Sequence, residues 1–295
     1  MRVTENMTMN MVLASLQKQQ DLVNNLQQQI STGQKINEPS DDPVSAQQSL
    51  DLKGLIATTD QYTRNIQTGT SWLSQMDSSM SEMNNVLVRA KELATQMSNG
   101  TYDAGQRQSA ALEVTQLRDQ MIALGNTQIA GKYVFGGYVS DQPPFDATTG
   151  SYNGTEDDVN IQISQGSSMT INYSGGKLLR GSGGGTDVIG TLNDLVTALN
   201  NDDQSGVAAT ITGLDDSLQQ IQAAQGDVGA RENRLQTAGN VLSNTKDNLT
   251  KALSGKEDAD YLQVMSDLSK QQTAYQATLA ATAKFSQLSL LDYMQ

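Results

Sequence analysis

The stretch "SWLSQMDSSMSEMNNVLVRAKELATQM", residues 71–97, places an apolar residue at every third or fourth position. Traced back to Leu52, the same row is broken only by Thr59 and Gly69. Such sustained spacing is typical of coiled coils, so we predict one long helix over about residues 44–98. The row consists of Leu52, Leu55, Thr59, Tyr62, Ile66, Gly69, Leu73, Met76, Met80, Met83, Leu87, Ala90, Ala94 and Met97.

A second, less pure row lies in the C-terminal half and predicts a second long helix. Shorter helical patterns cover residues 105–129 and 187–200. The second row consists of Val207, Ile211, Leu214, Leu218, Ile221, Gln225, Val228, Glu232, Leu235, Gly239, Leu242, Lys246, Leu249 and Leu253.

Both ends of the chain also follow helical rows, and each row contains one Gln. A polar residue in such a row can fix the register of a coiled coil, or it can be a tolerated position in an ordinary amphipathic helix. Both interpretations stay open. The N-terminal row is Met9, Val12, Leu16, Gln19, Val23, Leu26 and Ile30, and the C-terminal row is Tyr261, Met265, Leu268, Gln272, Tyr275, Leu279 and Thr282.

Residues 131–190 have a different character, because they are rich in glycine and contain Pro143 and Pro144. Apolar residues alternate with polar ones on both sides of "SQGSS", residues 164–168, which indicates a β-hairpin. The order of elements is therefore nearly palindromic. We expect a mainly α fold, an elongated antiparallel helical coiled-coil rod built from the N- and C-terminal halves, with a small inserted β unit at the mid-chain tip.

This pattern predicts three parts, of which the β unit is the smallest. Because it has few apolar residues, we expect a short Gly/Ser linker in its place to leave the helices folded. The expected parts are a terminal coiled-coil domain (1–40 and 256–295), a long-helix rod domain (41–131 and 186–255) and a small β-rich outer domain (132–185).

Composition excludes most catalytic chemistry. The chain has no histidine and no cysteine, so the usual general base, thiolates and zinc ligands are missing. No phosphate-binding or calcium-loop motif is present, and we expect no enzyme activity, no cofactor and no metal. The net charge of −13 disfavours nucleic acid as a partner. No apolar run approaches the roughly 18 residues that span a membrane, so we expect no membrane insertion. The stretch "MRVTENMTMN" lacks the apolar core of a cleaved signal peptide.

The acidic stretch "KINEPSDDPVSAQQS", residues 35–49, is interpreted as a helix joint rather than a catalytic or metal site. Gly33 can end the first helix, and Pro39 disfavours helical backbone before it. Asp42 can cap the next helix with Pro43 at its first position, while Asp41 also suits the positive helix end. A second joint has Gly255 as a helix stop, followed by Glu257, Asp258 and Asp260 at the next start.

Several motifs resemble the bacterial flagellin superfamily, over about residues 1–140 and 226–295. "LQQQISTGQKINEPSDDP" is similar to the first helix and corner of flagellins, and "NNVLVRAKELATQMSNGTY" to their long helix. "KYVFGG" resembles the entry into their outer domain. "GKEDADYLQVMSDLSKQQTAYQATLAATAKFSQLSLL" resembles the C-terminal helix.

The opening "MRVTENMTMN" and the ending "LLDYMQ" are more similar to the superfamily members that join hook to filament than to filament flagellins. The resemblance implies an extracellular structural protein of the flagellum, exported by the flagellar type III apparatus and assembled as a ring of subunits. The implied partners are copies of itself, the first hook-associated protein, flagellin and a flagellar export chaperone. The alternatives are a filament flagellin or a coiled-coil surface adhesin.

The final residues carry more apolar side chains than one row can bury. An exposed apolar terminus usually marks a partner surface, although a tail folded back on its own rod would also bury it. Together with the implied ring, this predicts that both terminal rows contact neighbouring subunits. The extra apolar residues at the C-terminus are Leu288, Leu290, Leu291, Tyr293 and Met294.

Overall fold

The chain forms two compact units in a computed structural model that describes residues 5–293, with side chains at residue 7 and at 9–283. Unit 1 holds the residues up to 58 and those from 245 onward, and unit 2 holds Thr59–Asn244. The division falls inside two long helices, so each helix belongs partly to one unit and partly to the other.

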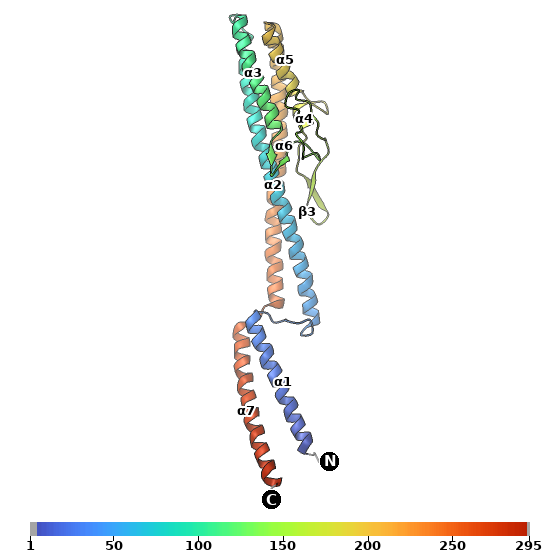
Figure 1. The fold of residues 1–295 in the computed structure, drawn as a ribbon, viewed down its shortest axis with the longest axis vertical. Coiled ribbons are helices and arrows are strands. Elements are labelled where there is room, and N and C mark those ends of the chain that lie inside the picture. Colours follow the sequence, from blue (N-terminus) through green and yellow to red (C-terminus); the bar gives the residue numbers. More distant parts are fainter. Residues whose placement is uncertain (1–4, 294–295) are drawn as a thin grey trace. The chain divides into compact units, whose positions relative to one another are not determined.

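Seven helices and four short strands make up the described residues (Figure 1). This confirms a mainly α fold with a small β region inserted between the two helical halves. The elements are α1 (Glu5–Thr32), α2 (Pro43–Met97), α3 (Ala104–Gly125), β1 (Gln128–Ile129), β2 (Lys132–Tyr133), β3 (Asn160–Ser164), β4 (Ser167–Thr170), α4 (Gly175–Leu179), α5 (Val188–Asn200), α6 (Gln204–Glu257) and α7 (Tyr261–Tyr293).

Inside unit 2, α2 and α6 run antiparallel against each other. Ile66 of α2 lies 3.7 Å from where a Cβ on Gly239 of α6 would be, and further along α2 Lys91 forms an ion pair with Asp215. From Thr59 to Met97, every member of the α2 row is buried or half-buried, and so is every member of the α6 row from Val207 to Leu242. The two predicted rows are therefore the facing surfaces of these helices.

One end of unit 2 is closed by the turns that join α2 to α3 and α5 to α6. Arg107 of α3 is buried there, donates through Nε to the Met97 carbonyl at 3.2 Å, and forms an ion pair with Asp202. The Gln204 side chain donates to the Ser98 carbonyl at 2.7 Å. These contacts join the two helical turns to each other.

The predicted hairpin is formed by β3 and β4, which pair antiparallel with Asn160 opposite Thr170. Its apolar face rests on α2 at Gly69. A Cβ at that position would lie 2.7 Å from Ile161 and 3.0 Å from Ile171. The glycine that interrupts the α2 row is thus the place where the hairpin packs against the helix.

The β region lies alongside α2 and α6, not at a tip beyond them (Figure 1). This corrects the expected position, because α3 and α5 extend the helical part past the hairpin. The β region also belongs to one continuous hydrophobic cluster with the helices of unit 2. Its buried members are Val134, Phe135, Phe145, Ile163, Met169, Ile171, Leu178 and Leu179.

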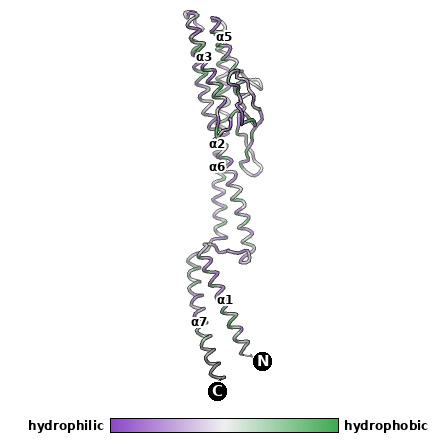
Figure 2. The backbone as a smooth tube through the Cα atoms, viewed as in Figure 1, coloured by the Kyte–Doolittle hydropathy of each residue, from purple (hydrophilic) through white to green (hydrophobic). Residues whose placement is uncertain are grey.

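Hydrophilic and hydrophobic residues alternate along the helices in Figure 2. Among the described residues, no helix is long and apolar enough to cross a membrane.

Candidate functional site

The candidate site is unit 1, because both terminal helices and both predicted joints lie in it. Here α1 packs along α7. The α1 row is half-buried from Val12 to Ile30, at the steps of three and four that the sequence shows, whereas Met9 is exposed. The predicted row is therefore the face that α1 turns toward α7 of the same chain. Contact with a neighbouring subunit stays a prediction.

The row of α7 that faces α1 is rotated slightly about the helix axis from the row predicted from sequence. Its buried and half-buried members are Val264, Leu268, Gln271, Tyr275, Thr278 and Thr282. Only Leu268, Tyr275 and Thr282 belong to both rows. The other predicted members, Tyr261, Met265, Gln272 and Leu279, are exposed on a neighbouring face.

The first joint begins where α1 ends at Thr32. Gly33 has a φ of +73° and donates its N–H to the Gln29 carbonyl at 2.9 Å, which is how a left-handed residue closes a helix. A Cβ at Gly33 would lie 2.9 Å from the Tyr261 hydroxyl of α7. Left-handed backbone and close approach of α7 both favour glycine at this position.

A tight turn then leads into α2. Asp41 accepts hydrogen bonds from the N–H groups of Asn37 and Glu38 at 3.1 and 3.0 Å, so its carboxylate holds the turn around Pro39 and not the helix end. Asp42 caps α2 directly in front of Pro43, which is the first helical residue.

Hydrogen bonds from the side chain and backbone of Ser45, aided by the N–H of Val44, hold the pKa of the Asp42 carboxyl below its usual value. Because the folded-state pKa is lowered, the cap stabilises the fold above the unfolded-state pKa. Its contribution is lost as the pH falls through the folded-state value.

The second joint lies further along the chain than predicted. Helix α6 continues through Gly255 and ends at Glu257. Gly255 does not adopt the left-handed backbone that closes a helix, so it is not the predicted stop. Asp258 accepts a hydrogen bond from the Ser254 hydroxyl behind it. The cap of α7 is Asp260, whose side chain accepts from the N–H groups of Leu262 and Gln263 at 3.0 and 3.3 Å.

The two joints are bonded to each other. Gln34 and Asp258 form an antiparallel bridge, in which the Lys35 N–H donates to the Glu257 carbonyl at 2.6 Å and the Ala259 N–H donates to the Gly33 carbonyl at 2.9 Å. The break between α1 and α2 therefore stands beside the break between α6 and α7. Sequence patterns did not indicate this pairing, since neither segment alternates like a strand.

An ion pair that the sequence did not indicate supports the joints. Nζ of Lys53 in α2 lies 2.7 Å from Oε1 of Glu257 at the end of α6, and the Glu257 side chain is only 8% exposed. A buried carboxylate needs a partner, because it has lost its contact with water. Lys53 supplies that partner.

We expect Lys53→Met to lower the free energy of unfolding by about 1–3 kcal/mol, since the substitution leaves a buried carboxylate without its cation. Urea titrations of the single variants and of Lys53→Met with Glu257→Gln form a double-mutant cycle. The double variant should be more stable than the sum of the single losses predicts. Lys18→Met, at an exposed position of α1, is the control. Strict additivity in the cycle would contradict a coupled pair.

Apolar side chains remain exposed in unit 1 after α1 and α7 have packed together. On α7, Leu262 is 84% and Met265 59% exposed. Contiguous exposed apolar surface usually marks a contact with a partner. The exposed apolar residues of unit 1 are Met7, Met9, Met11, Leu13, Leu22, Val44, Leu50, Leu55, Tyr261, Leu262, Met265 and Leu279.

The extra apolar residues at the C-terminus lie outside the described side chains. Leu288, Leu290, Leu291 and Tyr293 fall within the backbone of α7, and Met294 follows it. Among the described residues there is also no group of three or more acidic side chains placed to hold a metal ion.

Comparison with known proteins identifies both helical ends of the chain as regions found in flagellins. The bacterial flagellin N-terminal helical region matches residues 3–140, and the bacterial flagellin C-terminal helical region matches residues 211–294. Flagellar hook-associated protein 3 of Escherichia coli is 30% identical over 90% of both chains. The protein of the same name from Salmonella typhimurium is 28% identical over 99% of both.

A solved structure of a related protein has a similar fold. The crystal structure of Bacillus cereus FlgL is 26% identical, with a TM-score of 0.60 over 69% of this chain and 99% of that one. The two regions matched by the flagellin family models contain α1, both joints and α7, the elements that form the candidate site. The chain belongs to the flagellin-related family of flagellar hook-associated protein 3 and is a structural component of the bacterial flagellum.

Proposed function

We propose that this protein is the adapter at the junction of hook and filament. It forms a ring of its own copies on the first hook-associated protein and offers the surface on which flagellin assembles. The observation that carries this proposal is family membership at both ends of the chain. The exposed apolar side chains of α1 and α7 support it, because packing within unit 1 leaves them without a partner.

In a ring, the exposed apolar surface of each subunit can be buried against its neighbour. In a ring of identical subunits, one face of each subunit contacts a different face of the next. The α1–α7 pair has such a second face, formed on α7 by Leu262, Met265 and Leu279. These side chains are the ones we assign to contacts between subunits, with the inward row from Val12 to Ile30 holding α1 on α7.

Export and domain roles follow from the same family. We infer that the chain leaves the cell through the flagellar type III apparatus without a cleaved signal peptide, with an export chaperone bound to its C-terminal helix until assembly. The terminal domain (1–40 and 256–295) would form the inner tube, and the rod (41–131 and 186–255) and β region (132–185) would lie further out.

The second candidate function is that of a filament subunit, because the matching family regions are those of flagellin itself. The two functions differ in the product of assembly. An adapter added to purified hooks should stop at a short collar visible by negative-stain electron microscopy. Growth of long filaments from this protein alone would instead favour the filament subunit.

We expect the double substitution Leu262→Ser and Met265→Ser to prevent collar formation while the monomer stays folded. Both side chains are mostly exposed in the chain alone, so their loss should change stability by no more than about 0.5 kcal/mol. The control is Leu112→Ser on α3, a leucine outside unit 1 whose exposure lies between those of Leu262 and Met265. A double variant that still decorates hooks at normal concentration would rule out this face as a subunit contact.

A further inference from the structure

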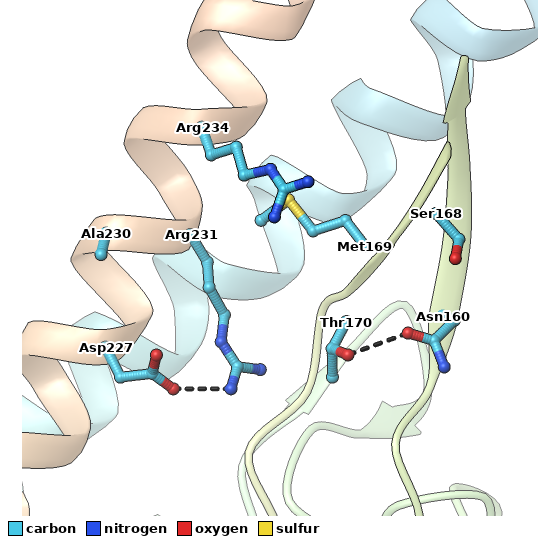
Figure 3. A pocket seen from close by; sticks show the side chains of 8 residues that line it. All are labelled: Asn160, Ser168, Met169, Thr170, Asp227, Ala230, Arg231 and Arg234. Atoms are coloured by element: carbon cyan, nitrogen blue, oxygen red, sulfur yellow. Dashed lines mark hydrogen bonds and ion pairs between the residues drawn. The ribbon is translucent and has the colours of Figure 1, made fainter. Parts of the chain in front are cut away.

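A polar cleft of about 370 Å³ lies in unit 2, between the β3–β4 hairpin and α6 (Figure 3). Its volume falls at the lower end of the range for small-molecule sites. None of its side chains belongs to the rows that pack the helices together. The cleft is lined by Asn160, Ser168, Met169, Thr170, Asp227, Ala230, Arg231 and Arg234.

One wall of the cleft is fixed in place. Arg231 donates to the Asn172 carbonyl at 2.8 Å and forms an ion pair with Asp227 at 2.6 Å, with its side chain 25% exposed. On the hairpin, the Thr170 hydroxyl donates to the Asn160 side-chain oxygen at 2.8 Å. These contacts hold Arg231 and Thr170 in position before any ligand arrives, which lowers the entropy lost on binding.

Other polar groups in the cleft have unused hydrogen-bonding capacity. Arg234 projects from α6 toward the hairpin, and within the described part of the chain it has no ion pair or hydrogen bond (Figure 3). The same is true of the Ser168 hydroxyl on β4, again among the residues described. Thr170 has already donated its proton, so its oxygen is left as an acceptor.

The local charge of the cleft is opposite to that of the chain. Two guanidinium groups and one carboxylate give it a net positive charge, whereas the whole chain carries −13. A guanidinium presents a planar fork of N–H donors that matches a carboxylate with two parallel hydrogen bonds. Arg234 is the guanidinium left available for this role, since Arg231 is occupied by Asp227.

We propose that this cleft binds a small hydroxylated carboxylate, of the size and class of a uronic acid. The carboxylate pairs with Arg234, and the hydroxyl groups of the ligand bond to Ser168 and to the Thr170 oxygen. This role does not depend on the place of the protein in the flagellum, because none of these residues lies in unit 1.

The test is a calorimetric titration of the full-length protein with D-glucuronate, and with D-glucose as the neutral analogue, at equal ionic strength. We expect saturable glucuronate binding with a Kd on the order of 1 mM, and binding of glucose at least about tenfold weaker. Arg234→Gln should weaken glucuronate binding about tenfold. Arg64→Gln, at an exposed arginine of α2 that does not line the cleft, should leave glucuronate binding unchanged.

A second variant separates binding from structure. Among the described residues that line the cleft, Asp227 is the only carboxylate. Asp227→Asn should therefore make glucuronate bind several-fold more tightly, whereas a purely structural role for Asp227 gives no such gain. The proposal is overturned if wild-type protein shows no saturable binding up to about 50 mM, or if Arg234→Gln binds equally well. It is also overturned if glucose binds as tightly as glucuronate. If Arg234→Gln alters self-association in sedimentation while glucuronate does not bind, the cleft is a contact between copies of the chain, and the proposal fails.

Discussion

A chain in which a short Gly/Ser linker replaces residues 132–185 is expected to lose the cooperative unfolding of unit 2. The β region contributes large, fully buried side chains to the hydrophobic cluster that α2 and α6 share. Removing one such side chain costs roughly 2–5 kcal/mol, and a whole domain is stable by only about 5–15 kcal/mol. The loss of several at once should exceed the stability of the unit.

The measurement is urea unfolding followed by circular dichroism and by the fluorescence of Trp72, the only tryptophan of the chain, which packs against this cluster. We expect a broad, weakly cooperative transition in place of a sharp one. This reverses the expectation from sequence, in which the β region was peripheral. A linker variant with an unchanged transition would show that the helices of unit 2 are stable without the hairpin.

A single substitution tests the same packing on a smaller scale. Phe145 is 1% exposed and lies against Gly125 of α3. The centroids of its ring and the Tyr152 ring are 5.2 Å apart, and the two ring planes are tilted by 51°. Phe145→Ala should therefore lower the free energy of unfolding by about 3–5 kcal/mol. Tyr138→Ala, at an exposed position of the same region, should cost less than about 1 kcal/mol and serves as the control.

Removal of residues 286–295 is expected to abolish incorporation at hook tips while the monomer keeps its fold. Thr282 is the last described member of the α7 row that faces α1, so the truncation leaves the described contacts of unit 1 in place. The deleted segment contains the five extra apolar residues at the C-terminus, which the sequence predicts to contact a partner, and burial of each leucine contributes roughly 1.5–3 kcal/mol. In a ring, that loss recurs at every interface.

Far-ultraviolet circular dichroism and the melting temperature should be nearly unchanged, and cells with the truncated protein should be non-motile and release flagellin into the medium. A full-length control carries Gln287→Ala and Ser289→Ala, which leave the apolar residues intact. Normal decoration of hooks by the truncated protein would contradict the proposed role. A large drop in the melting temperature of the monomer would mean that the tail packs on its own chain.

Much of the helical architecture could be predicted because it depends on periodicity. The long helix expected over 44–98 runs from Pro43 to Met97, and the α6 row was identified over its whole length in unit 2. Gly69 looked like a defect in the α2 row. Only the fold shows that Ile161 and Ile171 pack there, since a contact between residues so distant in sequence leaves no periodic signal.

The α7 row illustrates where periodicity stops being informative. Met265, Gln272 and Leu279 repeat every seven residues just as the true facing residues do, and they are no less apolar than Gln271 or Thr278. Which of two adjacent stripes is buried depends on where α1 lies around α7, and this is a property of the packed pair. The ion pairs of Lys53 and of Arg107 were missed as well, because a single pair of charges far apart in the sequence has no repeat to detect.

The methionines with described side chains lie in two environments, and this decides where an oxidant in solution can act. Met76, Met80 and Met83 are completely buried in the α2 row, whereas Met7, Met9, Met11 and Met265 are exposed on the terminal helices. Oxidation to the sulfoxide turns an apolar side chain into a polar one, and accessible sulfur atoms react first. Mild oxidation would therefore leave the fold of unit 2 intact and add oxygen to the surface assigned to contacts between subunits.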